Sequence, residues 1–146
     1  MIWREAVAAD IPAVVALLRD DMLGQGRELS DLQTYLDAFT AMRAEGANHL
    51  IVADDAGAIA ACYQITFITG LSLSASRRAQ VEGVRVRADR RGTGLGSELM
   101  ADAEVRARAA GCALLQLTTN RARGDAHRFY DRLGFTASHI GYKKPL

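Results

Sequence analysis

Apolar residues recur every three or four positions in two stretches of the first 45 residues, and this spacing predicts two amphipathic helices. The first helix is expected to begin at Asp10, which can cap it, and to end before Gly24-Gln25-Gly26. The second is expected to begin at a capping box of Ser30 and Gln33 and to stop near Gly46. Its buried stripe would consist of Leu32, Tyr35, Leu36, Phe39 and Met42.

Short apolar runs bounded by turn residues predict the strands of a sheet, and Asp54-Asp55-Ala56-Gly57 predicts a hairpin turn between two of them. Two more helices are expected, at residues 94–110, where Gly111 would end the helix, and at residues 125–133. The apolar face of the first would consist of Leu95, Leu99, Ala103 and Ala107. The expected strands are residues 3–6, 48–53, 58–68, 80–87, 113–118 and 135–142. This order predicts an α/β (mixed α+β) fold, in which helices cover both faces of a mixed, mostly antiparallel sheet.

Length and composition place the chain among soluble globular proteins. Its 146 residues can bury one hydrophobic core, so we expect a single domain spanning residues 1–146. No apolar run approaches about 18 residues and the N-terminus lacks a signal-peptide pattern, so we expect a cytoplasmic protein with no membrane segment. Cys62 and Cys112 are too few for a disulfide framework or a zinc site, and we expect both to be buried free thiols.

Residues 82–97 predict a strand, then a basic glycine-rich loop, then the first turn of a helix. Gly92 and Gly94 permit a backbone with positive φ and let a ligand approach the main chain. Such a loop presents N–H groups and a helix N-terminus to an anion such as a pyrophosphate. A P-loop would need a lysine between Gly96 and Ser97, and a dinucleotide fingerprint has another glycine spacing, so both of these nucleotide sites fit poorly.

Two motifs in this order resemble the GNAT superfamily of N-acetyltransferases. Arg91-Gly92-Thr93-Gly94-Leu95-Gly96 resembles that family's pyrophosphate loop, Gln/Arg-x-x-Gly-x-Gly/Ala. Residues 125–135 are similar to its closing motif, Ala-x-x-Phe-Tyr-x-x-x-Gly-Phe, and residues 119–130 are similar to aminoalkylphosphonate N-acetyltransferases. The resemblance implies the GNAT acyl-CoA N-acyltransferase fold, in which two central strands splay apart, and an enzyme that uses acetyl-CoA as co-substrate.

The resemblance also implies which residues contact acetyl-CoA. These are Val84, Arg85, Val86, Arg91, Gly92, Thr93, Gly94, Leu95, Gly96, Ser97, Asn120 and Phe129. Arg121 or Asp125 could replace Asn120 beside the pantetheine arm. Residues 1–60 carry a net charge of −6 and residues 61–146 a net charge of +7. The phosphates of CoA suit a compact basic patch, and no nucleic-acid partner is expected. The clustered bases are Arg77, Arg78, Arg85, Arg87, Arg90 and Arg91.

Acetyl transfer to an amine needs a base, because an ammonium group has no lone pair. Glu82 is the candidate base, since a partly buried glutamate can have a raised pKa. Alternation along the strand would place Glu82, Val84 and Val86 on one face, with Arg85 and Arg87 on the other. An ion pair with one of these arginines is the alternative role of Glu82.

The resemblance implies that Tyr130 is the general acid that protonates the departing thiolate, because the pKa of a phenol lies above that of a thiol. The alternative is a tyrosine that packs in the core beside Phe129. The resemblance also implies that a backbone N–H of residues 84–86 stabilises the oxyanion. The expected reaction is direct transfer from acetyl-CoA to a primary amine in a ternary complex.

The acceptor is expected to be a small molecule, and a protein N-terminus or lysine is the alternative. A non-catalytic acyl-CoA-binding sensor is the second hypothesis. Acceptor specificity is expected from the first two helices, from residues 23–29 and from residues 68–76, with Asp21, Glu28 and Tyr63 as candidate lining groups. No metal site is expected, because the histidines are scattered. A homodimer is possible through the final strand.

Overall fold

The computed structural model describes residues 1–21, 23–28 and 30–146, which form two compact units, Met1–Gln116 and Leu117–Leu146. The first unit contains β1 (Ile2–Glu5), η1 (Ala8–Asp10), α1 (Ile11–Arg19), α2 (Gly24–Arg27), α3 (Leu32–Ala44), β2 (Asn48–Asp55), β3 (Ala58–Ile68), α4 (Ser72–Ala75), β4 (Arg78–Val86), η2 (Ala88–Arg90) and α5 (Leu95–Ala109). β5 (Leu114–Leu117) ends one residue into the second unit, which also contains α6 (Gly124–Arg132).

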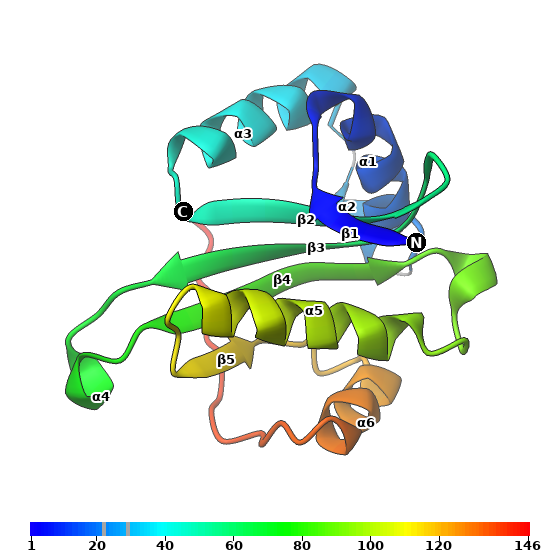
Figure 1. Cartoon of the computed structure of the whole chain (residues 1–146). Coiled ribbons are helices and arrows are strands. Elements are labelled where there is room, and N and C mark those ends of the chain that lie inside the picture. Colours follow the sequence, from blue (N-terminus) through cyan, green and yellow to red (C-terminus); the bar gives the residue numbers. More distant parts are fainter. Residues whose placement is uncertain (22, 29) are drawn as a thin grey trace. The chain divides into compact units, whose positions relative to one another are not determined.

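The strands form one sheet in the order β1-β2-β3-β4-β5. β1 to β4 pair antiparallel. β5 runs in the same direction as β4, because Ala113 N–H donates to the Arg77 carbonyl at 2.7 Å and the Gln116 amide meets Gln80 at 2.7 Å. Helices α1 and α3 cover one face of the sheet and α5 covers the other (Figure 1). The predicted mixed, mostly antiparallel sheet with helices on both faces is confirmed.

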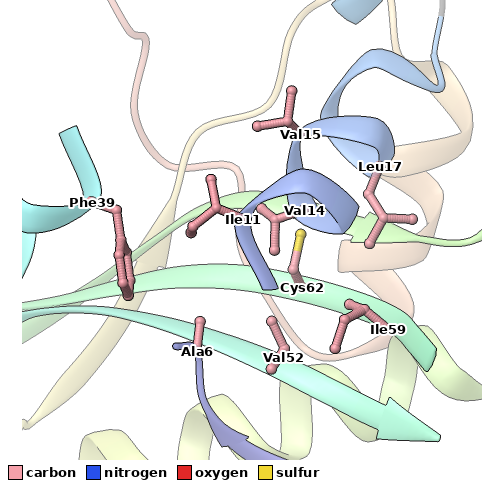
Figure 2. Packing of buried hydrophobic residues seen from close by; sticks show 9 residues of the cluster. All are labelled: Ala6, Ile11, Val14, Val15, Leu17, Phe39, Val52, Ile59 and Cys62. Carbon is pink, nitrogen blue, oxygen red and sulfur yellow. The ribbon is translucent and has the colours of Figure 1, made fainter. Parts of the chain in front are cut away.

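Two apolar layers hold the first unit together. Between α1, α3 and the sheet lie Ala6, Ile11, Val14, Val15, Leu17, Phe39, Val52, Ile59 and Cys62, all buried (Figure 2). On the opposite face, α5 buries Leu95, Leu99, Met100, Ala103 and Ala107, which confirms the apolar face predicted for that helix. Complete burial of a side chain such as Leu99 contributes about 2 kcal/mol to folding.

The turn between β2 and β3 forms as the sequence predicts. Ala56 and Gly57 both have positive φ, and the Asp54 carboxylate accepts a hydrogen bond from the Gly57 N–H at 2.7 Å. This side-chain acceptor and the permissive glycine stabilise a tight hairpin.

The start of α1 differs from the sequence prediction. Asp10 stands at the N-cap position, but its side chain makes no capping hydrogen bond to the helix. Its carboxylate instead accepts from the Val7 N–H at 2.8 Å and from the two terminal nitrogens of Arg4 at 2.7 and 3.0 Å. The nearby guanidinium is a stronger partner for a carboxylate than a backbone N–H of the helix.

The start of α3 also differs, since Asp31 caps the helix and the predicted box of Ser30 and Gln33 does not form. The Asp31 carboxylate accepts from the Thr34 N–H at 3.0 Å, while the Gln33 side chain binds Asp37. The two candidate caps are adjacent in sequence, and the carboxylate occupies the capping position. Of the predicted stripe, Phe39 is buried, whereas Leu32 at the first turn is exposed.

Two connections between the predicted elements contain short helical turns, α2 at residues 24–27 and α4 at residues 72–75. The strand predicted at residues 135–142 is wrong, because those residues have no regular secondary structure. Their large apolar side chains, Ile140 and Tyr142, are exposed, so no apolar face holds the segment within its unit. None of the helices described is long and apolar enough to cross a membrane.

Candidate functional site

The glycine-rich loop places free backbone N–H groups at the start of α5. Gly92 and Gly94 have φ of +74° and +92°, and an added Cβ at either position would meet no atom within 4 Å. Ser97 and Glu98 donate to the Gly94 carbonyl, whereas the N–H groups of described residues 92–96 have no hydrogen-bond partner. The loop is exposed, so its N–H groups and the helix N-terminus can meet an anion from solvent.

Arg91 secures the loop to α1 and β4. Its Nη2 donates to the backbone oxygen and the carboxylate of Asp20, both at 3.0 Å, and its Nε donates to the Val86 carbonyl at 3.1 Å. The Arg91 and Asp20 side chains are about half exposed (51% and 49%), so this ion pair is weak and a phosphate could displace the carboxylate.

The other arginines of the predicted basic patch also pair with carboxylates. Arg90 pairs with Asp55, and Arg87 pairs with Asp89 at 2.6 Å. Arg85 forms a mostly buried ion pair with Asp21 at 2.9 Å. Much of the positive charge that the sequence concentrates here is therefore balanced by acids within the same unit.

A β-bulge interrupts β4 beside Glu82. Gln64 pairs with Glu82 but Cys62 pairs with Arg85, so β4 contains one residue more than β3 over this interval. Gly83 has φ of +60°, the conformation in which glycine forms such a bulge. A glycine within a strand is the sequence feature that could have indicated the bulge.

The bulge overturns the predicted alternation of faces along β4. The side chains of residues that pair directly across a sheet lie on the same face. Glu82 pairs with Gln64 and Arg85 pairs with Cys62, and Gln64 and Cys62 lie two residues apart on β3. Glu82 and Arg85 therefore lie on the same face. Val86 lies on the other face. Glu82 itself is exposed rather than partly buried.

The far edge of β4 is only partly covered by β5. Hydrogen bonds join the two segments at Arg77, just before β4, and at Gln80, near its start. β5 ends at Leu117, whereas β4 continues to Val86. Within residues 1–116, no strand therefore lies beside the outer edge of residues 82–86, where the sequence analysis expects an oxyanion donor.

Tyr63, a candidate lining group, and Cys62, an expected buried thiol, are both fully buried. Tyr63 is fully buried under α5 and donates to Asp102, which also accepts from Arg106 Nε at 2.7 Å. Burial raises the pKa of the Tyr63 phenol. Burial likewise raises the pKa of the Cys62 thiol to about 12, which confirms Cys62 as an inert buried thiol, whereas Cys112 is only partly buried. Tyr63 is therefore not a lining group for the acceptor.

Two other candidate lining groups have partners. Asp21 pairs with Arg85, and Glu28 accepts from the Tyr35 hydroxyl at 3.0 Å and pairs with Arg27. The predicted segment 23–29 includes Leu29, which lies outside the described residues.

The second unit contains the remaining predicted site residues. Tyr130 is partly buried on α6, where its ring makes edge-to-face contacts with Phe129 at 5.1 Å and Phe135 at 5.7 Å between centroids. The Asn120 side chain accepts from the Ala122 N–H at 2.9 Å, so it stabilises the turn before α6. Among the described residues, no three histidine, cysteine or acidic side chains gather as a metal site would require.

The fold and the loop can be compared with known proteins. The sequence profile of the Acetyltransferase (GNAT) family matches residues 11–135. The chain belongs to this family. Its members transfer acetyl groups and use acetyl-CoA as co-substrate, so this GNAT protein is an acetyl-transferring enzyme. The resemblance found in the sequence is confirmed.

Several relatives cover the whole length of the chain. It is 32% identical to an aminoalkylphosphonate N-acetyltransferase from Salmonella typhimurium, over 98% of this chain and 90% of that protein. Its sequence is 42% identical to that of a transcriptional regulator from Bacillus halodurans C-125. The crystal structure of that protein matches the fold with a TM-score of 0.94, and 99% of both chains is covered. A protein from Agrobacterium tumefaciens described as a candidate acetyltransferase is 26% identical, with a TM-score of 0.88 and both chains fully covered.

Proposed function

We propose that the enzyme transfers the acetyl group of acetyl-CoA directly to a primary amine of a small acceptor, within a ternary complex. The observation that carries this proposal is the exposed loop of residues 92–94. Its N–H groups, with those of Leu95 and Gly96 in the first turn of α5, have no hydrogen-bond partner among the described residues and suit a pyrophosphate. The remaining contacts to the co-substrate would come from Val84, Arg85, Val86, Arg91, Ser97, Asn120 and Phe129.

Glu82 would accept the proton of the acceptor amine. Ordinary amines have a pKa near 10, so the exposed carboxylate would act through water. Tyr130 would protonate the departing thiolate, and a backbone N–H of residues 84–86 would stabilise the oxyanion. These three groups meet the three chemical requirements of acetyl transfer to nitrogen.

We propose short amines as the first acceptors to test, including amines with a phosphonate group, because the Salmonella relative is named for such substrates. A protein N-terminus or lysine is the alternative acceptor. We further propose a single domain spanning residues 1–146, a cytoplasmic location and a homodimer. The strand predicted at residues 135–142 does not form, so a dimer would need another surface.

A non-catalytic acyl-CoA sensor is the second candidate function. The relative that is 42% identical is described as a transcriptional regulator, which favours this alternative. The sensor and the enzyme would both bind acetyl-CoA, and only the enzyme would release free thiol when an amine is added.

Calorimetric titration of the purified protein with acetyl-CoA, with ATP as the control, tests the site. We expect micromolar binding of acetyl-CoA and none of ATP. No binding up to about 1 mM acetyl-CoA, equivalent to only about −4 kcal/mol, would contradict the proposal.

Release of free thiol with a panel of amines then separates the enzyme from the sensor. Glu82→Gln and Tyr130→Phe should fold and bind acetyl-CoA as the wild type does but lower kcat by about a hundredfold, the usual range for loss of a general base or acid. Unchanged kcat in either variant would remove that residue from the proposed chemistry.

A further inference from the structure

The face of the sheet that carries Glu82 is polar over the first half of β4. Pairs Gln64–Glu82, Thr66–Gln80 and Asn48–Thr66 lie directly across from one another, so all of these side chains share one face. Gln116 joins them through its bond to Gln80. We call Asn48, Gln64, Thr66, Gln80 and Gln116 the polar row.

The polar row is partly buried and only partly satisfied. The Asn48 side-chain oxygen accepts from Gln64 at 2.8 Å and from Thr66 at 3.3 Å, and the Gln80 oxygen accepts from Gln116 at 2.7 Å. The Gln80 amide nitrogen has no bond in the described structure. The opposite face of the same strands is buried and apolar, with Ile65, Ala79 and Val81. Burying polar side chains under an apolar helix would cost free energy, so the polar row suits contact with a polar ligand.

Arg78 lies at the end of this surface. It pairs with Ile68, so it shares the face of Gln80 and Glu82, two and four residues further along β4. The side chain is partly buried, and its Nη1 would lie 3.3 Å from a Cβ built on Gly70. The absence of a side chain at Gly70 leaves space beside the guanidinium.

Arg78 differs from the other arginines of residues 1–116. Each of the others has an ion pair, a hydrogen bond or an aromatic ring contact; for example, Arg77 donates to the Ala110 carbonyl and Arg43 stacks on Phe39. Arg78 has none of these with any described residue. A partly buried guanidinium without a partner is costly, and phosphonate and carboxylate groups are the anions that its planar fork binds best.

We propose that Arg78 binds an acidic group of the acceptor while the amine to be acetylated lies near Glu82. The Cα atoms of the two residues are about 13 Å apart along the strand, and the two long side chains shorten the gap between their charges. Gln80, between them, contributes a free amide N–H. The enzyme is thus selective for short molecules that carry an amine at one end and a phosphonate or carboxylate at the other. This inference rests on the proposed function.

The test compares three acceptors that differ in their acidic group: 2-aminoethylphosphonate, 3-aminopropanoate and 1-aminopropane. Wild type, Arg78→Gln, Arg78→Lys and the control Arg108→Gln are assayed by thiol release for KM and kcat. Arg108 is an exposed arginine on α5, so its loss should change nothing. Calorimetric binding of 2-aminoethylphosphonate to each protein with CoA provides a readout that is independent of turnover.

We expect Arg78→Gln to raise the KM for acceptors with an acidic group by about tenfold to a hundredfold, with kcat nearly unchanged. The KM for 1-aminopropane should stay the same, and Arg78→Lys should lie between. The acidic acceptor with the lower wild-type KM shows whether the site prefers phosphonate or carboxylate. An equal change in KM for all three acceptors, or no change, would overturn the proposal.

Failure of the proposed function has a different outcome. If the wild type acetylates no amine, the proposed function fails, but calorimetry still tests Arg78. Binding of 2-aminoethylphosphonate that is lost in Arg78→Gln supports the role of Arg78. Absence of binding to the wild type refutes it. If Arg78→Gln does not fold, Arg78→Lys decides, because weaker binding of acidic acceptors alone supports the role and unchanged binding refutes it.

Discussion

Gly94 sets the conformation of the loop at the level of a single residue. It has φ of +92° immediately before α5, in a region that side chains with a Cβ rarely adopt. The space around it is open, so a substitution would act through backbone strain and not through a clash.

Gly94→Ala should lower the free energy of unfolding by about 1 kcal/mol and weaken acetyl-CoA binding, because the strained loop would turn its N–H groups away. Chemical denaturation and calorimetry measure the two effects. Gly26→Ala, in open space without a positive φ, is the matched control. If both variants had the same free energy of unfolding and the same affinity for acetyl-CoA, the site would not require this loop conformation.

At the scale of elements, the junction of β1 and α1 depends on one buried carboxylate. Hydrogen bonds from Arg4 are the largest cause that lowers the pKa of Asp10, and the Val7 N–H adds to it. Because the folded state favours the carboxylate, this stabilisation is present above the unfolded pKa of about 3.9 and is lost as pH falls through the lower folded pKa.

Asp10→Asn should therefore lower the free energy of unfolding at pH 7 by about 2 kcal/mol and flatten the loss of stability below about pH 4. Urea unfolding from pH 2 to pH 7 measures this. Asp37→Asn, at an exposed position on α3, is the comparison. A variant with the same acid dependence as wild type would show that the junction does not depend on the ionised Asp10.

Charge is organised at the scale of the whole first unit. The sequence separates acids in residues 1–60 from bases in residues 61–146, and the fold brings them together. Asp20, Asp21 and Asp55 come from the acidic part, and each pairs with an arginine of β4 or of the loop that follows it. These carboxylates therefore partly neutralise the basic patch that the sequence predicts.

Asp20→Asn should tighten acetyl-CoA binding up to about fivefold at low salt, because an exposed ion pair worth up to about 1 kcal/mol no longer competes for Arg91. The difference should shrink at high salt. Calorimetry at two salt concentrations measures it, with Asp89→Asn, whose partner is Arg87, as the control. Weaker binding in Asp20→Asn would mean that Asp20 orients Arg91 for the ligand.

Local sequence determined much of this protein. The hairpin at Ala56–Gly57, the apolar face of α5 and the glycine loop each depend on residues a few positions apart, and all three form as predicted. The same loop, with the motif at residues 125–135, was sufficient to indicate the family. Conformational preference and hydrophobic periodicity act over that short range, so they can be recognised in one sequence.

Tertiary structure decided the rest. The face of Glu82 follows from a bulge that exists only when β4 pairs with β3, and Asp10 does not cap α1 because Arg4 binds its carboxylate. Arg78 can be distinguished only in the folded structure, because every other arginine of its unit has an ion pair, a hydrogen bond or an aromatic ring contact. Register and ion pairing join residues far apart along the chain, and their energies depend on positions that only the folded molecule fixes.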